Sequence, residues 1–427
     1  MGLMGTTPGF GRTALAAAIL TISAQSATAD TTTVTAEGKA TASELEQYSP
    51  YTPYGRQYAL MREALARYLA LAESDTWEPL PDGQALTPGV RDERVKVLRS
   101  LLLQYGDLPV TGDMPAAEND STGGAKASDP TRFDTGLRSA VERFQRRHGL
   151  RADGIVDRNT REHLNIPPQQ RLATLRANLT RWQTMPKDLG PRYILVNIPD
   201  FSLRLVQGEK EQYRMRVVVG KSEHATPQLS TRLTQVVFNP TWTVPRNIAV
   251  RELLPKGSAN LVAGGYRLVN NRGKSVPFSG SNLRALRLGS VALQQRGGEG
   301  NALGRFKFVI PNRQAIFLHD TNRKQLFSRS QRAFSHGCIR LEKPRELAEI
   351  VLASQGNWDT EKLVRMTTGS RTRAVTLEQP IPVHIAYWTA WVDDEGLLNF
   401  RPDIYGRDRP DAEKVAQSGG ADKQVQE

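Results

Sequence analysis

The spacing of apolar residues changes near residue 188, and this change restricts the fold of the 427-residue chain more than any other feature. Before it, apolar side chains recur at intervals of three and four, which is typical of one buried face of a helix. The segments with this spacing are 58–72, 95–103, 137–147, 159–164 and 169–185. After it, β-branched residues alternate or run together, as strands do. We therefore predict an α+β fold, with a helical N-terminal half followed by a mostly-β half.

The β half contains several strand-like segments and one clear helix. Strands are expected at 193–198, 202–206, 215–220, 234–244, 306–310, 315–318 and 382–392. The helix is predicted at 344–352. Residues 245–300 are rich in Gly, Asn and Arg and are longer than a simple strand connection.

The N-terminus and the net charge indicate where the protein works. Arg12 precedes a short apolar run, 14–22, and the small residues Ala27-Thr28-Ala29 follow, as in a signal peptide cut after Ala29. An uncleaved membrane anchor is the alternative, although the run is too short to span a bilayer comfortably. The charge of +13 favours an anionic partner, and export argues against nucleic acid. An anionic wall polymer or a lipid surface remains.

Cys338 is the single cysteine and is therefore without an internal disulfide partner. A free thiol is prone to oxidation in an oxidising compartment, so we expect an accessible one only where its chemistry is used. Cys338 is therefore either a nucleophile or a packed residue. A nucleophilic thiol needs a base. Of the six histidines, His319 follows a strand-like run and His336 lies two residues before the thiol. We favour His319 as the base, because His336 reaches the thiol only through a tight bend at Gly337.

The other histidines are given structural interpretations. We expect His148 and His163 to be solvated, His224 to be a loop residue, and His384 to be packed or hydrogen-bonded in a strand. Trp242 and Tyr266 are expected to pack in the core or in the insertion.

His319, 16 residues before Ser335-His336-Gly337-Cys338-Ile339-Arg340, resembles the signature of the L,D-transpeptidase catalytic domain. Other stretches are similar to the large periplasmic Gram-negative branch of that family, in which an insertion caps the active site. These stretches are 192–199, 217–221, 238–245, 301–308, 317–321 and 387–392. Around Phe144-Gln145, Gly149-Leu150, Asp153-Gly154 and 160–164 the chain resembles a small helical peptidoglycan-binding module, with Asp157 where glycine is usual. A helical spacer is the alternative for this segment.

The resemblance implies a role for each residue of the motif. Cys338 would be the nucleophile and His319 the proton donor and acceptor, while His336 and Gly337 would form the oxyanion region. Asp320 would orient His319 through either its carboxylate or its backbone carbonyl. Ser335 and Arg340 would bind substrate, with Arg340 facing the carboxylate of the donor peptide. An ion pair of Arg340 with Asp320 or Glu342 is the alternative.

The expected domain order follows from these observations. It comprises a signal peptide (1–29), a flexible lead (30–57), a helical scaffold (58–115 and 168–187) and a peptidoglycan-binding-like module (130–167). A catalytic domain (188–408) with a capping insertion (245–300) and a disordered tail (409–427) follow.

The resemblance also implies a reaction, a compartment and partners. A periplasmic enzyme would join diaminopimelate residues of two peptidoglycan tetrapeptide stems through a cysteine thioester, and carbapenems would acylate it. No cofactor or metal is expected, because the sequence has no His/Cys cluster at metal spacing. Water or a lipoprotein as acceptor, and a non-catalytic wall-binding protein, are the alternatives.

Overall fold

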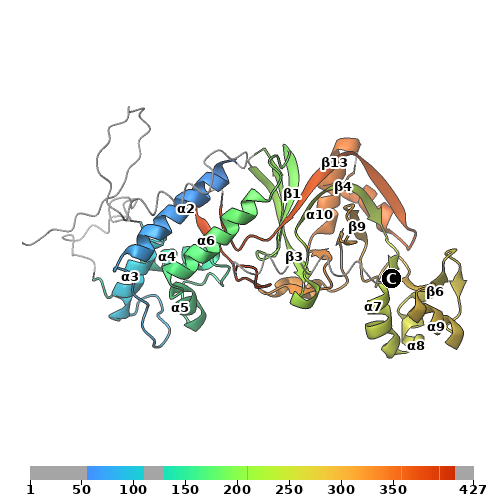
Figure 1. Ribbon diagram of the computed structural model, residues 1–427, viewed down its shortest axis with the longest axis horizontal. Helices are drawn as coiled ribbons and strands as arrows, with labels where there is room; N and C mark the ends of the chain where they lie inside the picture. The colour runs from blue at the N-terminus through green and yellow to red at the C-terminus, as the bar shows by residue number, and fades with distance from the viewer. Residues whose placement is uncertain (1–54, 110–128, 209, 357, 394, 409–427) are drawn as a thin grey trace, which may run out of the picture.

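A computed structural model describes residues 55–408, except 110–128, 209, 357 and 394 (Figure 1). The predicted α+β order is confirmed: helices occupy the N-terminal half and strands dominate the rest. The expected signal peptide, most of the lead and the tail lie outside the described residues. The N-terminal helices are α2 (Gly55–Glu73), α3 (Arg94–Gln104), α4 (Thr135–Arg147), α5 (Arg158–Leu164) and α6 (Pro168–Gln183). No helix in the described ranges is long and apolar enough to cross a membrane.

The five helices are divided between two hydrophobic cores. Helices α2 and α6 pack together and against the strands β14 (Ala390–Val392) and β15 (Leu398–Phe400). Helices α3, α4 and α5 share a separate core around Phe133 and Phe144. We assigned residues 95–103 to the scaffold, and this was wrong: α3 lies in the core of the module. Apolar spacing identifies the buried face of a helix but not the neighbour that buries it.

Two residues of the module differ from expectation for local reasons. His148 is 3% exposed rather than solvated, because its ring stacks on Phe144 with centroids 3.8 Å apart. Asp157 is the N-cap of α5, and its carboxylate accepts a hydrogen bond from the Thr160 N–H at 2.8 Å. Its φ of −77° does not require glycine, so aspartate caps this helix at no conformational cost.

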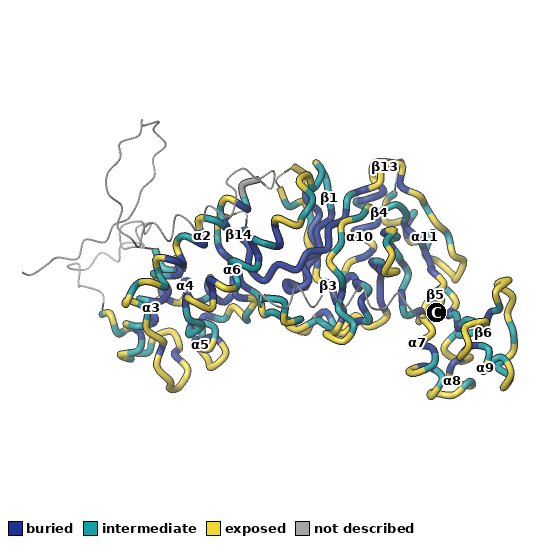
Figure 2. Tube along the Cα trace, in the orientation of Figure 1, coloured by how far each residue is buried: buried dark blue, intermediate teal, exposed yellow. Residues whose placement is uncertain are grey.

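Most strands of the β half form one sheet that closes on itself. The strands are β1 (Arg192–Asn197), β2 (Ser202–Gln207), β3 (Lys210–Gly220), β4 (Leu229–Phe238), β9 (Phe306–Val309), β10 (Leu318–His319), β11 (Ala333–Ser335), β12 (Ile339–Leu341) and β13 (Arg373–Ala386). Among the described residues their order is β11-β3-β12-β10-β9-β4-β13-β1-β2, and β2 also pairs with β3. Helices α10 (Pro344–Leu352) and α11 (Thr360–Thr367) contribute to the core. Figure 2 shows the buried residues running through the sheet and the scaffold.

Two predicted strands are each divided between sheets. The segment 234–244 leaves the large sheet at Asn239, whose φ is +46°, and continues as β5 (Trp242–Thr243) in another sheet. The segment 382–392 was predicted as one strand, but β13 ends at Ala386 and β14 pairs with β15. Asn178 of α6 bonds both the N–H and the hydroxyl of Thr389, at 2.9 and 2.7 Å. These bonds hold the chain against the scaffold and away from the large sheet.

The expected insertion folds as a small lobe (Figure 1). A four-stranded sheet joins β5 to β6 (Tyr266–Asn270), β7 (Ser275–Val276) and β8 (Val291–Gln295). Three helices and two irregular helical turns complete it: α7 (Arg246–Ile248), η2 (Ala249–Leu253), η3 (Leu254–Lys256), α8 (Ser258–Ala263) and α9 (Gly280–Leu288). The lobe has its own hydrophobic core, against which Trp242 and Tyr266 pack as predicted.

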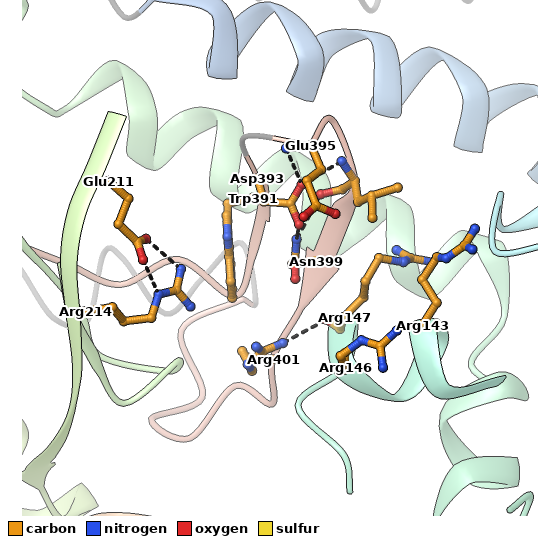
Figure 3. A pocket seen from close by; sticks show the side chains of 11 residues that line it. Arg143, Arg146, Arg147, Glu211, Arg214, Trp391, Asp393, Glu395, Asn399 and Arg401 are labelled. Atoms are coloured by element: carbon orange, nitrogen blue, oxygen red, sulfur yellow. Dashed lines mark hydrogen bonds and ion pairs between the residues drawn. The ribbon is translucent and has the colours of Figure 1, made fainter. Parts of the chain in front are cut away.

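The module contacts the hairpin formed by β14 and β15 through two arginines. Arg147 of α4 forms a buried ion pair with Asp107 and donates to the carbonyl of Leu398. Arg401 donates to the carbonyl of Arg147 at 2.7 Å and pairs with Asp200 at 2.8 Å. Figure 3 shows Arg147 and Arg401 among the side chains that line a cavity here. The volume of this cavity is about 440 Å³. Because Arg147 is satisfied from both sides, it ties the module to the hairpin.

Candidate active site

Strand pairing brings the cysteine loop beside His319. Cys338 lies in the loop between β11 and β12, and β12 runs parallel to β10 with Arg340 opposite His319. The N–H of Ile339 donates to the carbonyl of Phe317 at 3.1 Å, which fixes the end of the loop. Because Arg340 pairs with His319, their side chains lie on one face of the sheet, and Arg340 is close enough to the Cys338 thiol for its charge to act on the thiol's pKa.

His319 is oriented by a backbone carbonyl. Its side chain is 5% exposed, and Nδ1 lies 2.5 Å from the backbone oxygen of Asp320. Because a carbonyl can only accept, Nδ1 carries the proton and Nε2 is the acceptor in the neutral ring.

The carboxylate of Asp320 is engaged elsewhere. It accepts from the N–H groups of Thr321 and Arg305, at 2.7 and 2.8 Å, and from the ammonium of Lys324 at 2.6 Å. The question that the sequence left open therefore has an answer in the geometry: the carbonyl, not the carboxylate, contacts the imidazole.

Ser335 and Gly337 shape the cysteine loop from within. The Ser335 hydroxyl donates to the Cys338 carbonyl at 2.6 Å and accepts from the Gly337 N–H at 3.1 Å. Thr226 donates to the Gly337 carbonyl at 2.8 Å. The φ of Gly337 is +108°, which favours glycine. Ser335 is buried in these contacts rather than directed at a ligand, so the structure places it as a loop brace.

The backbone amides at the thiol differ in what they contact. The Gly337 N–H already donates to Ser335. The N–H groups of His336 and Cys338 have no protein acceptor in the described ranges. These two amides are therefore available to an oxyanion that forms next to the thiol.

The insertion contacts the loop through a residue that sequence reasoning missed. Nε2 of His336 lies 2.7 Å from a carboxylate oxygen of Glu252, in the π-helical turn η2. The imidazole ring of His336 also stacks on the ring of His224, with centroids 4.7 Å apart. His224, interpreted only as a loop residue, is thus part of the site. Glu252 lies 84 residues from His336, and no local pattern pairs the two.

Burial keeps the Cys338 thiol and the His319 imidazole neutral. Desolvation lowers the pKa of His319 to about 3, and the positive charge of Arg340 acts in the same direction. Burial raises the pKa of the Cys338 thiol above its usual range, against the opposing effects of the Phe317 backbone N–H and of Lys307 and Arg340. The resting pair at pH 7 is therefore a thiol and a neutral imidazole, which suits general-base activation of the nucleophile.

Arg340 has no carboxylate partner among the described residues. Of the two alternatives, Asp320 pairs with Lys324 and Glu342 pairs with Arg216. Burial lowers the pKa of the partly buried guanidinium, and Arg323 adds to this effect. A cation near the thiol that lacks a counter-ion among the described residues is suited to bind a carboxylate.

Comparisons with known proteins place the site in a family context. Residues 191–382 match the family model of the L,D-transpeptidase catalytic domain. Residues 91–164 match that of a “Putative peptidoglycan binding domain”, which includes α3 in agreement with its packing. A Haemophilus influenzae protein named “Putative L,D-transpeptidase” is 34% identical over 220 residues, which are 51% of this chain. The match covers 44% of that relative, so the chain spans less than half of its length.

Solved structures of low sequence identity are also similar. An L,D-transpeptidase from Stackebrandtia nassauensis is 14% identical, with 72% of this chain and 97% of that chain covered and a TM-score of 0.25. L,D-transpeptidase 3 from Mycobacterium tuberculosis, in complex with a faropenem-derived adduct, is 11% identical. There the match covers 46% of this chain and 60% of that chain, with a TM-score of 0.22.

Proposed function

We propose that this protein, whose residues 191–382 match the family model of the L,D-transpeptidase catalytic domain, crosslinks peptidoglycan through a thioester on Cys338. The donor would be a tetrapeptide stem and the acceptor the side-chain amine of diaminopimelate in a second stem. We further propose that the enzyme works in the periplasm, where this polymer lies.

In the first step the thiol becomes acylated. Neutral His319 takes the proton of Cys338 on Nε2 while Sγ attacks the carbonyl between the L-centre of diaminopimelate and the terminal D-Ala. The N–H groups of His336 and Cys338, which have no acceptor among the described residues, would stabilise the oxyanion. When the C–N bond breaks, His319-H⁺ protonates the leaving amine, and D-Ala departs. Arg340 would hold a carboxylate of the donor stem.

In the second step the acceptor amine attacks the thioester. His319 accepts a proton from the amine, and the C–S bond breaks when the tetrahedral intermediate collapses. The proton returns from His319 to Sγ, so the thiol and the neutral imidazole are restored. The product is an amide between two diaminopimelate residues. Water in place of the amine would instead give a shortened stem.

One observation carries this proposal: the Asp320 carbonyl sets the tautomer of His319 so that Nε2 is an acceptor, on a strand that pairs with the strand directly after Cys338. The test is mass spectrometry of disaccharide-tetrapeptides after incubation with the purified chain. We expect crosslinked dimers and free D-Ala from the native protein and neither from the Cys338→Ser variant. Shortened monomers alone would identify a carboxypeptidase, and an unreacted substrate would contradict the proposal.

Acylation by a carbapenem gives a second measurement that is independent of the acceptor. The intact mass should rise by one inhibitor molecule, because the thiolate opens the β-lactam ring and retains it as a thioester. The Cys338→Ser variant should stay unshifted. A native protein without the adduct would contradict a reactive thiol at this position.

A further inference from the structure

A second pocket lies away from Cys338, where the module meets the scaffold. It has a volume of about 370 Å³ and is lined by α5, α6 and the residues that follow β15. Part of its wall is apolar, with Ile166, Phe400 and Pro402. The polar part includes Arg171, His148 and His163. A hollow in which an apolar wall faces several convergent polar groups is typical of a binding site.

Arg171 is a buried cation without a protein counter-ion. It is 8% exposed, and its guanidinium lies over the ring of Phe400 at 4.2 Å. Nη2 donates to the carbonyl of His163 at 3.1 Å, and no carboxylate in the described part of the chain pairs with it. Burying a charge in this way is costly unless an anion compensates it. The guanidinium is therefore suited to bind an anion that enters the pocket.

The two acidic residues that line the pocket do not supply that anion. Asp403 accepts from the hydroxyl of Tyr387 at 2.6 Å and from the N–H of Arg407 at 2.8 Å. Asp408 pairs with Arg181 at 2.8 Å. Neither carboxylate forms an ion pair with Arg171 in the described part of the chain, so its charge stays uncompensated there.

The two histidines restrict the ligand further. Nδ1 of His148 lies 2.8 Å from the carbonyl of Phe144, and Nδ1 of His163 lies 2.9 Å from that of Asn159. Each Nδ1 therefore carries the proton of the neutral ring, and each Nε2 is an acceptor. Burial lowers the pKa of both imidazoles, and the charge of Arg171 adds to this effect, so the rings are neutral. They accept O–H or N–H groups and do not attract a second negative charge.

We propose that this pocket binds a carboxylate-bearing peptide or amino-sugar unit, with the carboxylate on Arg171 and its amide or hydroxyl donors on His148 and His163. The identification of that unit as part of peptidoglycan rests on the proposed function. The volume of the pocket suits about one peptide residue or one sugar unit. It would anchor the polymer at the junction of module and scaffold while Cys338 acts on another part of it.

The experiment measures binding of a soluble disaccharide-tetrapeptide to the full chain by titration calorimetry. Cys338→Ser is the background, so the probe is not consumed. The Cys338→Ser protein with an unaltered pocket should bind the probe at two sites, one in this pocket and one at the loop that carries residue 338. Arg171→Gln removes the cation, and Ala173→Phe fills the pocket from the exposed surface of α6 without touching the core. Arg158→Gln, which replaces an exposed arginine of the neighbouring helix α5 outside the pocket, is the charge control.

We expect Arg171→Gln and Ala173→Phe each to weaken one of the two sites about tenfold or more, and Arg158→Gln to leave both intact. A probe with amidated carboxylates should lose the same site. Should Arg171→Gln unfold, as thermal melting would show, Ala173→Phe decides the matter.

Three outcomes would overturn the proposal: unchanged binding by the filled pocket, unchanged binding of the amidated probe, or displacement of the probe from this site by inorganic phosphate. Crosslinking is measured separately with the native thiol. Binding at the pocket by a protein that forms no crosslink would leave this site standing and refute the proposed function alone.

Discussion

Replacing Asp320 with Asn separates two ways in which this residue could support His319. The backbone carbonyl, which receives the Nδ1–H at 2.5 Å, is unchanged by the substitution. The carboxylate, which bonds two backbone N–H groups and Lys324, loses its charge and one acceptor oxygen. If the carbonyl orients the base, Asp320→Asn should disturb stability more than chemistry.

The magnitude follows from the contacts that are lost. One buried N–H is left without an acceptor, which costs about 1–3 kcal/mol. The ion pair with Lys324, whose side chain is half exposed, contributes about 0–1 kcal/mol. We expect a loss of about 1–4 kcal/mol in the free energy of unfolding and a change in turnover of less than about tenfold. Where an aspartate carboxylate orients a catalytic histidine directly, the same substitution lowers turnover about ten-thousandfold.

The assay combines urea unfolding with the initial rate of crosslink formation at saturating donor. Lys324→Gln is the matched control, because it removes the ion pair and leaves every backbone contact of Asp320 in place. It should cost less than about 1 kcal/mol and leave the rate unchanged. A folded Asp320→Asn protein whose rate falls a thousandfold or more would refute the assignment of the carbonyl as the group that orients His319.

Three further predictions follow from the site and its supports. Crosslinking should persist as the pH falls from 7 to 5, because His319, with a pKa of about 3, stays neutral. A base of ordinary pKa would be about thirtyfold less available at pH 5, and such a loss in the pH–rate profile would contradict the perturbed pKa. Glu252→Gln should lower kcat/KM for soluble donor severalfold with less than about 1 kcal/mol lost in stability, because the partly exposed pair with His336 braces the loop. If Glu252→Gln and the exposed control Glu299→Gln had equal kcat/KM, the role of Glu252 in bracing the loop would be contradicted. Asp107→Asn leaves Arg147 buried without its counter-ion and should cost about 3–5 kcal/mol in urea unfolding, and a cost below about 1 kcal/mol would show that the pair does not hold the module.

The amino-acid sequence by itself determined the local elements and the reacting groups. Apolar spacing placed the helices from α2 to α6 and most strands of the sheet, because the period of burial is set within each segment. The lone thiol of Cys338, the histidine at the end of a strand and the glycine that permits the bend identified the loop, because their chemistry needs few residues close in the chain.

The tertiary structure decided what each element packs against and which partner each polar group finds. Spacing showed that α3 buries a face, but only the fold showed that α4 and α5 bury it. Likewise the segment 382–392 has strand-like spacing throughout, and its division at Ala386 depends on the contact of Asn178 with Thr389. A periodic pattern indicates which face of an element is buried but not which element buries it. The packing partner therefore cannot be predicted from the local sequence.

The same limit applies to the polar groups of both sites. The pairing of Glu252 with His336 and the absence of a counter-ion at Arg171 depend on residues that are distant in the chain. A hydrogen bond or an ion pair requires its two atoms within about 3–4 Å, and only the folded backbone brings them there. For that reason the sequence predicted Cys338 as nucleophile and His319 as base, while the contact of the Asp320 carbonyl with His319 and the contact of Glu252 with His336 came from the fold.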